Sequence, residues 1–222
     1  FEVEEGTGAG CVVDTPLEPG PELAERLFRP LQAVVLTSAT LSIDGSFDYF
    51  ARQVGLDEAR TLAIAPAFAY REQALLCLPT DVPDPAGDEE SYLQQACAFL
   101  GRLASALGGR TLVLFTSHRA LRDAYRRLAD PLARADITLL GQGIDGGQAR
   151  LLEAFRRQQR AMLLGAASFW EGIDLPGDLL QCVVLMRLPF RPPGHPLTEA
   201  RLEAIASKGG DAFRHLTLPE AV

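Results

Sequence analysis

The sequence lacks long apolar segments, although apolar residues make up 47% of its 222 residues. No apolar run approaches the ~20 residues that a membrane-spanning helix needs, so we expect no membrane partner. Residues 1–5 show neither the basic nor the apolar region of a secretory signal, and there is no initiator Met, which suggests a fragment of a longer protein. We therefore expect a cytoplasmic, monomeric chain.

Residues that hold metals or form disulfides are few and scattered. No two cysteines form a C-x-x-C pair, which favours small buried side chains in a reducing compartment. The histidines do not have the spacing of zinc ligands, so we expect no metal in this chain. The residues concerned are Cys11, Cys77, Cys97, Cys182, His118, His195 and His215.

Basic residues are outnumbered, with 21 Lys and Arg against 29 Asp and Glu and a formal net charge of −8. This balance excludes a protein that coats nucleic acid with a wholly basic surface. It allows a local basic groove, because electrostatic steering depends on where charges lie. Much of the basic charge lies in residues 119–134 and 150–160.

The chain also lacks both common phosphate-binding fingerprints, G-x-x-x-x-G-K-[ST] and G-x-G-x-x-G. Residues 141–143 and 146–147 are glycine-rich without matching either pattern. We infer that the chain has no phosphate loop of its own. This absence also counts against a nucleotide-sugar or NAD enzyme.

Short apolar runs alternate along the chain with amphipathic segments of helical period. The runs predict strands at residues 11–13, 33–36, 74–78, 111–115, 137–140, 162–164 and 182–186. Helices are expected at residues 22–28, 47–54, 91–107, 148–157 and 198–206, with another directly after Ser117; Ser46 and Ser91 are the expected caps of two of them. The alternation predicts an α/β fold with a doubly wound, mainly parallel sheet.

The first candidate site, Ser117-His118-Arg119, lies where a predicted strand turns into a helix. Free backbone amides at a helix start, a hydroxyl and a cationic side chain can together bind an anion. The ligand would be a phosphate of a nucleotide or of a nucleic-acid backbone. The alternative is an ordinary helix cap beside a solvated arginine.

The second candidate site is the loop of residues 168–174, between two predicted interior strands. Loops at the carboxyl ends of parallel strands are where ligands bind in open sheets. Two carboxylates could serve acid–base chemistry or could position an arginine or a ribose. Two aromatic rings could stack on bases or belong to the core. The residues are Ser168, Phe169, Trp170, Glu171, Gly172 and Asp174.

Four segments in order resemble the motifs of one enzyme family. The sequence resembles the DinG/XPD family of superfamily 2 DNA helicases, closest to its bacterial DinG-like branch. The segment resembling motif III is VVLTSATL (34–41), that resembling motif IV is LVLFTSH (112–118), and that resembling motif V is SFWEGIDLPG (168–177). The segment LPF (188–190) resembles the stretch that follows motif V in this family. The resemblance implies a RecA-like lobe over residues 31–222, of the P-loop NTPase type without its own P-loop, and a lead-in segment over residues 1–30.

The resemblance also assigns roles to residues. It places Ser117, His118 and Arg119 on the path of single-stranded DNA, with Ser168, Phe169 and Trp170 as further DNA contacts. It places Glu171, Gly172 and Asp174 toward the ATP cleft, with Glu171 and Asp174 catalytic and Asp174 holding the ribose or an arginine finger. Ser38 and Thr40 would couple the ATP state to lobe movement.

The implied function is that of the second motor lobe of an ATP-dependent DNA helicase, which translocates on single-stranded DNA and unwinds duplex from 5′ to 3′ in DNA repair or replication. ATP and Mg²⁺ would be bound mostly by the first lobe of the same polypeptide. That lobe's phosphate loop and D-E-A-H box, an iron–sulfur insertion and the arginine-finger motif are absent from this sequence. We therefore expect no ATP hydrolysis by this chain alone. The alternative is a non-catalytic module that binds nucleic acid or protein.

Overall fold

The computed structural model describes residues 2–6, 9–13, 15–190 and 194–221, the first two ranges by their backbone only. The chain forms two compact units. We call Leu76–Pro189 the sheet unit, and Phe1–Leu75 together with Phe190–Val222 the terminal unit. These units are not the predicted lead-in segment (residues 1–30) and RecA-like lobe (residues 31–222). That division, which comes from the family resemblance, stays a prediction.

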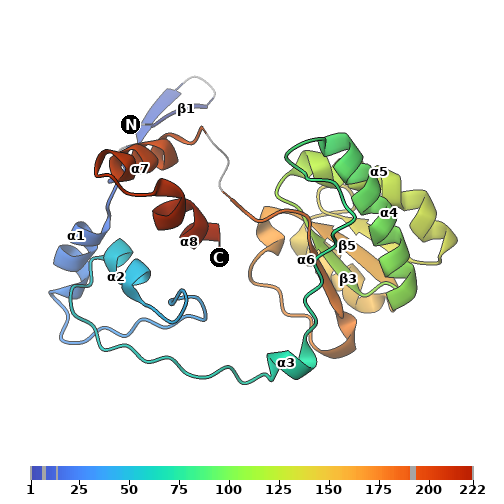
Figure 1. Cartoon of the computed structure of the whole chain (residues 1–222), viewed down its shortest axis with the longest axis horizontal. Helices are drawn as coiled ribbons and strands as arrows, with labels where there is room; N and C mark the ends of the chain where they lie inside the picture. Colours follow the sequence, from blue (N-terminus) through green and yellow to red (C-terminus); the bar gives the residue numbers. More distant parts are fainter. Residues whose placement is uncertain (1, 7–8, 14, 191–193, 222) are drawn as a thin grey trace. The chain divides into compact units, whose positions relative to one another are not determined.

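The sheet unit contains four strands, all parallel, in the order β4-β5-β3-β6 (Figure 1). Val113 of β3 pairs with Leu164 of β5 on one side and with Val184 of β6 on the other. The strands are β3 (Thr111–Leu114), β4 (Thr138–Gly141), β5 (Ala161–Gly165) and β6 (Cys182–Leu185). The predicted parallel α/β sheet is confirmed.

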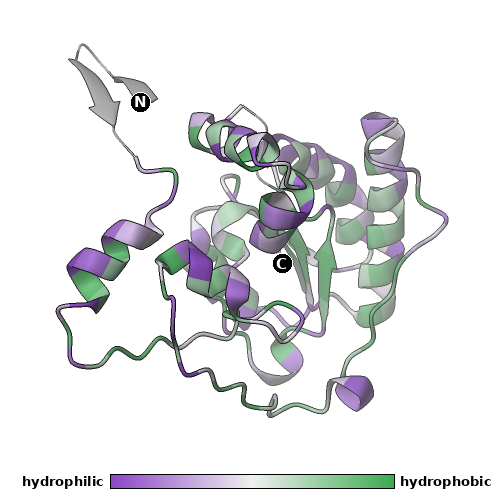
Figure 2. Ribbon diagram, turned by 60° about the vertical axis from the view of Figure 1, so that its left-hand side comes forward, coloured by the Kyte–Doolittle hydropathy of each residue, from purple (hydrophilic) through white to green (hydrophobic). Residues whose placement is uncertain are grey.

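Helices cover both faces of this sheet, because neighbouring residues of a strand point to opposite sides. Met162 and Leu164 pack in one apolar cluster with residues of α4 (Glu89–Leu107) and α5 (His118–Arg134). Leu163 packs in a second cluster with Leu151 and Phe155 of α6 (Gln148–Arg157). Figure 2 shows the apolar colouring of the strands between these helices. The fold is doubly wound.

Local capping signals explain where the helices begin. Helix α5 begins directly after Ser117, as predicted, and the Ser117 hydroxyl accepts a hydrogen bond from the Ala120 amide, which is the helix cap that we named as the alternative. The prediction that Ser91 caps α4 is wrong, because this helix begins earlier, at Glu89. Its cap is Asp88, whose carboxylate accepts from the amides of Glu90 and Ser91, each at 3.1 Å.

The terminal unit holds short elements. Strands β1 (Glu2–Gly6) and β2 (Ala9–Val13) pair antiparallel. Gly20, at the start of α1, and Gly55, which ends α2 in a left-handed conformation, approach so closely that a Cβ at Gly20 would lie 2.7 Å from the Gly55 nitrogen. The remaining elements are α1 (Gly20–Leu23), a π-helical turn (Ala24–Phe28), α2 (Asp48–Val54), α3 (Tyr70–Gln73), α7 (Pro196–Ser207), a second π-helical turn (Phe213–Thr217) and α8 (Leu218–Ala221).

Two predicted strands, at residues 33–36 and 74–78, are absent from the structure. Both segments lie outside any helix or strand, and Val35 and Leu75 are 83% and 87% exposed. A strand needs a neighbour to accept and donate its ladder hydrogen bonds. Apolar composition alone predicted these strands, and no described strand pairs with either segment.

A membrane-crossing helix is not found in the part of the chain that the structure describes, since no helix there is both long and apolar enough.

Candidate functional site

The carboxyl ends of the four parallel strands lie at one edge of the sheet unit. The loop after β3 carries Ser117, and the loop after β5 carries Ser168. Both predicted loops therefore lie at the same edge, although 51 positions separate these two serines in the sequence. This is the edge at which ligands bind in open α/β sheets.

Trp170 joins the two loops. Its indole nitrogen donates a hydrogen bond to the backbone carbonyl of Phe115, at 3.1 Å. Phe115 is buried and directly follows β3, two residues before Ser117. The half-buried Trp170 ring also packs against the apolar cluster around α6. Trp170 thus fixes one loop against the other.

Phe169 belongs to the core. Its side chain is 2% exposed and packs in the same cluster as Phe155 and Leu163. A ring enclosed in this way has no free face for a base. The predicted DNA contact of Phe169 is therefore wrong, and the core alternative holds for this residue.

Two glutamines hold the exposed Ser168. The Gln142 side chain accepts from the Ala166 amide at 2.7 Å and donates to the Ser168 hydroxyl at 3.0 Å. Gln148 donates to the Ser168 carbonyl at 2.7 Å. Sequence reasoning missed both residues. The available signal was the position of Gln142 directly after a strand, within a glycine-rich run that we considered only as a phosphate loop.

The two predicted catalytic carboxylates, Glu171 and Asp174, are exposed on the loop after β5. Arg156 of α6 donates to the backbone carbonyl of Asp174 at 3.0 Å and so anchors the loop. Gly172 has a φ of 71°, a left-handed conformation that favours glycine. Both carboxylates therefore lie on the exposed surface of an anchored loop.

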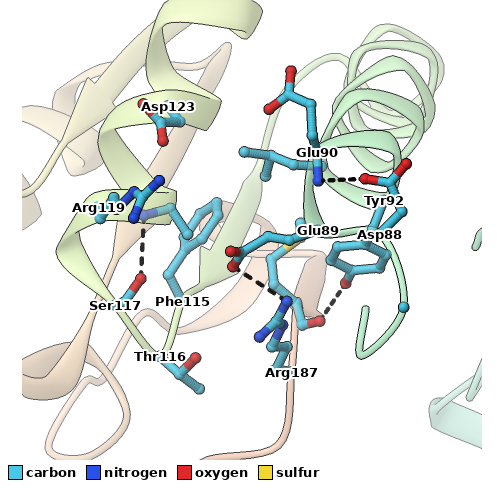
Figure 3. Close-up of a pocket in the computed structure, with 14 residues that line it drawn as sticks. Asp88, Glu89, Glu90, Tyr92, Phe115, Thr116, Ser117, Arg119, Asp123 and Arg187 are labelled. Carbon is cyan, nitrogen blue, oxygen red and sulfur yellow. Dashed lines mark hydrogen bonds and ion pairs between the residues drawn. The ribbon is translucent and has the colours of Figure 1, made fainter. Parts of the chain in front are cut away.

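A cavity of about 410 Å³ opens beside Ser117, between the starts of α4 and α5 (Figure 3). Arg187, which follows β6, lies at its wall, where it donates to the Pro85 carbonyl at 2.9 Å and contacts Glu89 at 3.3 Å. The Arg187 guanidinium carbon also lies 5.8 Å from the centre of the Tyr92 ring. Arg187 is therefore a structural cation in this wall, held by the segment before α4 and by the first residue of that helix.

Arg119 also lines this cavity, and its positive charge is available to bind an anion. The nearby acidic side chains are engaged: Glu90 with Arg127, and Asp123 with Arg126. Arg119 is exposed and, among the described residues, forms no ion pair. Burial raises the pKa of the Tyr92 phenol, which donates to the Met186 carbonyl, so Tyr92 stays neutral at physiological pH.

Ser38 and Thr40 belong to the terminal unit. Their hydroxyl oxygens are 3.2 Å apart, and the Thr40 amide donates to the Ser38 hydroxyl at 3.2 Å. These bonds form an exposed local turn. Its contacts with ATP or with another lobe stay predictions.

Metal-binding groups of three or more His, Cys, Asp or Glu side chains are not found among the described residues. Of the cysteines that the structure describes, Cys77 is exposed, Cys182 is half-buried and Cys97 is buried. The Cys11 side chain lies outside the described part.

The sequence is similar to those of several known proteins. Over 96% of its length the chain is 40% identical to "3'-5' exonuclease DinG" of Bacillus subtilis, covering 23% of that protein. It is 36% identical to "ATP-dependent DNA helicase YoaA" of Escherichia coli, over 94% of the chain and 32% of that protein. It is 36% identical to "ATP-dependent helicase DinG" of Mycobacterium tuberculosis, over 89% of the chain and 29% of that protein. The chain thus spans less than a third of each of these relatives.

The helicase C-terminal domain model matches residues 100–222, more than half of the chain. This match includes the parallel sheet, both sheet-edge loops and the SFWEGIDLPG segment. With the similarity to DinG and YoaA proteins along nearly the whole chain, the match shows that this chain belongs to the helicase C-terminal domain family.

Proposed function

We propose that this chain is part of the second motor lobe of an ATP-dependent DNA helicase. The parent protein translocates on single-stranded DNA and unwinds duplex from 5′ to 3′, in DNA repair or replication, in the cytoplasm. The observation that carries the proposal is the bonding of Trp170 to Phe115, which joins the two motif loops at one sheet edge. Two of the relatives, YoaA and the mycobacterial DinG, are named as ATP-dependent helicases.

The DNA backbone is the ligand that fits this edge best. Ser117, His118 and Arg119 at the start of α5 combine a hydroxyl, free amides and an unpaired cation. Ser168 adds an exposed hydroxyl on the neighbouring loop. Contacts of these kinds bind phosphates without reading sequence, as a translocating motor requires. Trp170, which is half-buried, remains a candidate for stacking on a base.

The nucleotide side of the proposal concerns the loop that Arg156 anchors. Glu171, Gly172 and Asp174 face ATP and Mg²⁺, which the first lobe of the same polypeptide binds. ATP hydrolysis would supply the free energy for translocation. Asp174 positions the ribose or an arginine finger, and Ser38 and Thr40 couple the nucleotide state to lobe movement. The chain alone is inactive as an ATPase, and measurable hydrolysis by residues 1–222 would contradict this.

The test is the ATP hydrolysis rate of the natural full-length protein, with and without single-stranded DNA, beside Asp174→Ala. Single-stranded DNA should raise the rate strongly, and Asp174→Ala should lower the stimulated rate by ~100-fold, the usual effect of losing one preorganised polar group. Asp178→Ala is the matched control, since this carboxylate lies four positions further and bonds only to Gln181 among the described residues. It should keep the rate. No hydrolysis under either condition would favour the non-catalytic binding module.

A further inference from the structure

Gln142 makes a pair of hydrogen bonds that the motif comparison does not explain. The residue directly follows β4, and its backbone amide extends the sheet by donating to the Leu164 carbonyl at 3.0 Å. Its half-buried side chain then reaches across to the loop after β5, where it bonds both the Ala166 amide and the Ser168 hydroxyl. One side-chain amide therefore bridges the start of the loop that carries the proposed DNA contact.

The Ala166 amide fixes which way the Gln142 side chain faces. A backbone N–H can only donate, so the Gln142 oxygen must face Ala166, which is itself 2% exposed. The Gln142 nitrogen must then face Ser168, and this nitrogen can only donate. The Ser168 oxygen is therefore the acceptor in that bond. Its own hydrogen is left to donate to another group.

Gln148 fixes the same residue from a second side. It is the first residue of α6, and its side-chain nitrogen donates to the Ser168 carbonyl. The carbonyl is thereby engaged and the Ser168 backbone held in place. The exposed hydroxyl is then the part of Ser168 that is free to bind a ligand, as a hydrogen-bond donor.

We propose that Gln142 and Gln148 are positioning residues that orient the Ser168 hydroxyl as a donor to an anionic oxygen, the phosphate of a single-stranded DNA backbone. This inference rests on the proposed function. It adds an orientation to the contact: a phosphate oxygen can only accept, and the bond from Gln142 to the Ser168 oxygen leaves the hydroxyl hydrogen available to it. Without Gln142, the hydroxyl hydrogen is free to turn inward.

The deciding substitution is Gln142→Glu. A glutamate still accepts from the Ala166 amide, so the loop keeps that bond. It cannot donate to Ser168, and instead it accepts the hydroxyl hydrogen, which is thereby lost to DNA. The measurement is the affinity of the full-length protein for a single-stranded oligonucleotide, in a double-mutant cycle with Ser168→Ala.

Ser168→Ala should weaken binding about tenfold, as for one hydrogen bond to a charged group. Gln142→Glu should weaken binding about tenfold more in the natural background than in the Ser168→Ala background, because the donor is already missing there. Repulsion from the added charge acts in both backgrounds and cancels in the comparison. For Ser168→Ala the slope of affinity against salt should stay unchanged, since a neutral hydroxyl displaces no counterion.

Gln159→Glu is the matched charge control. Gln159 is exposed and precedes β5, so it lies at the opposite edge of the sheet from Ser168. It should bind DNA like the natural protein. Thermal unfolding of each variant reports whether the fold is kept.

Each other outcome overturns the inference in a distinguishable way. Equal effects of Gln142→Glu in both backgrounds would remove Gln142 from the contact and leave the proposed function intact. Unchanged binding by Ser168→Ala would show that its hydroxyl is not the donor. If the natural protein does not bind single-stranded DNA, the proposed function fails and this inference fails with it.

Discussion

Gly165, the last residue of β5, leaves the space that the Phe169 ring occupies. A Cβ on this glycine would lie 2.5 Å from both the Cβ and the Cγ of Phe169, closer than carbon atoms can approach. Phe169 is enclosed by core residues and cannot move aside without disturbing them. The turn from β5 into the loop after it therefore requires a residue without a side chain at position 165.

We expect Gly165→Ala to lower the free energy of unfolding by about 1–3 kcal/mol, the usual cost of overpacking a core. The measurement is chemical denaturation of the two proteins. Gly101→Ala is the control of opposite sign: Gly101 lies inside α4 with only the Pro131 Cβ nearby, at 4.0 Å. Alanine there should stabilise the helix by about 1 kcal/mol. Equal stability of Gly165→Ala and the natural protein would contradict the packing argument.

The cysteines of the sheet unit should differ in reactivity. Burial raises the pKa of the Cys97 thiol to about 11, an effect that the nearby Arg127 charge only partly offsets. Because the thiolate is the nucleophile, Cys97 should resist alkylation at pH 8 in the folded protein, while the exposed Cys77 reacts. Mass spectrometry of the alkylated chain would identify the sites. Rapid modification of both residues without denaturant would disagree with the structure.

The sign of the associated stability change follows from the same pKa. Folding holds the Cys97 proton more tightly than the unfolded chain does, so its contribution to stability is full below about pH 9. That contribution should decline as the pH rises from about 9 to about 11. Cys97→Ala should remove this part of the alkaline decline.

At the scale of elements, the start of α4 depends on Asp88. Its carboxylate binds two free amides of the first helical turn, where negative charge is also favourable. We expect Asp88→Ala to cost about 1 kcal/mol of stability. Ser91 lies inside the helix, and among the described residues its hydroxyl accepts one bond, from Gln95 at 3.3 Å. Ser91→Ala should therefore cost little, and a larger loss for Ser91 than for Asp88 in thermal unfolding would overturn the assignment.

The elements that the sequence predicted best are those defined by local rules. Helical period predicted the bounds of α6, and the change from a strand-like run to helical period predicted that α5 starts directly after Ser117. The strands predicted at residues 33–36 and 74–78 are absent. Each would have needed a partner strand elsewhere in the chain, and composition does not reveal whether one exists. Ser117 and Ser168 share an edge because each follows a strand and the two strands are parallel. Gln142 was missed because its partner Ser168 lies 26 positions away.

At the scale of the whole molecule, the two units differ in how they are stabilised. Both large apolar clusters lie entirely within the sheet unit. The terminal unit exposes several large apolar side chains instead, among them Val35, Leu62 and Ile64. Hydrophobic burial is the main favourable term in folding, so the sheet unit holds most of the driving force.

We therefore expect residues 76–189 to fold alone and to unfold in one cooperative transition. Residues 1–75 alone should show no such transition, because no large apolar side chain is buried among the described residues 15–75. Thermal unfolding followed by circular dichroism would check both. A gradual, non-cooperative change in residues 76–189 would show that the sheet unit needs further segments.

The bond between Trp170 and Phe115 has an optical consequence. Trp170 is the only tryptophan of the chain, so its intrinsic fluorescence comes from one place, the junction of the two motif loops. Emission from an indole depends on its hydrogen bonding and on its exposure to water. The chain thus carries an intrinsic fluorescent reporter at the proposed DNA edge. Bound DNA that shifts one loop against the other would change the wavelength or intensity of the Trp170 emission without any attached dye.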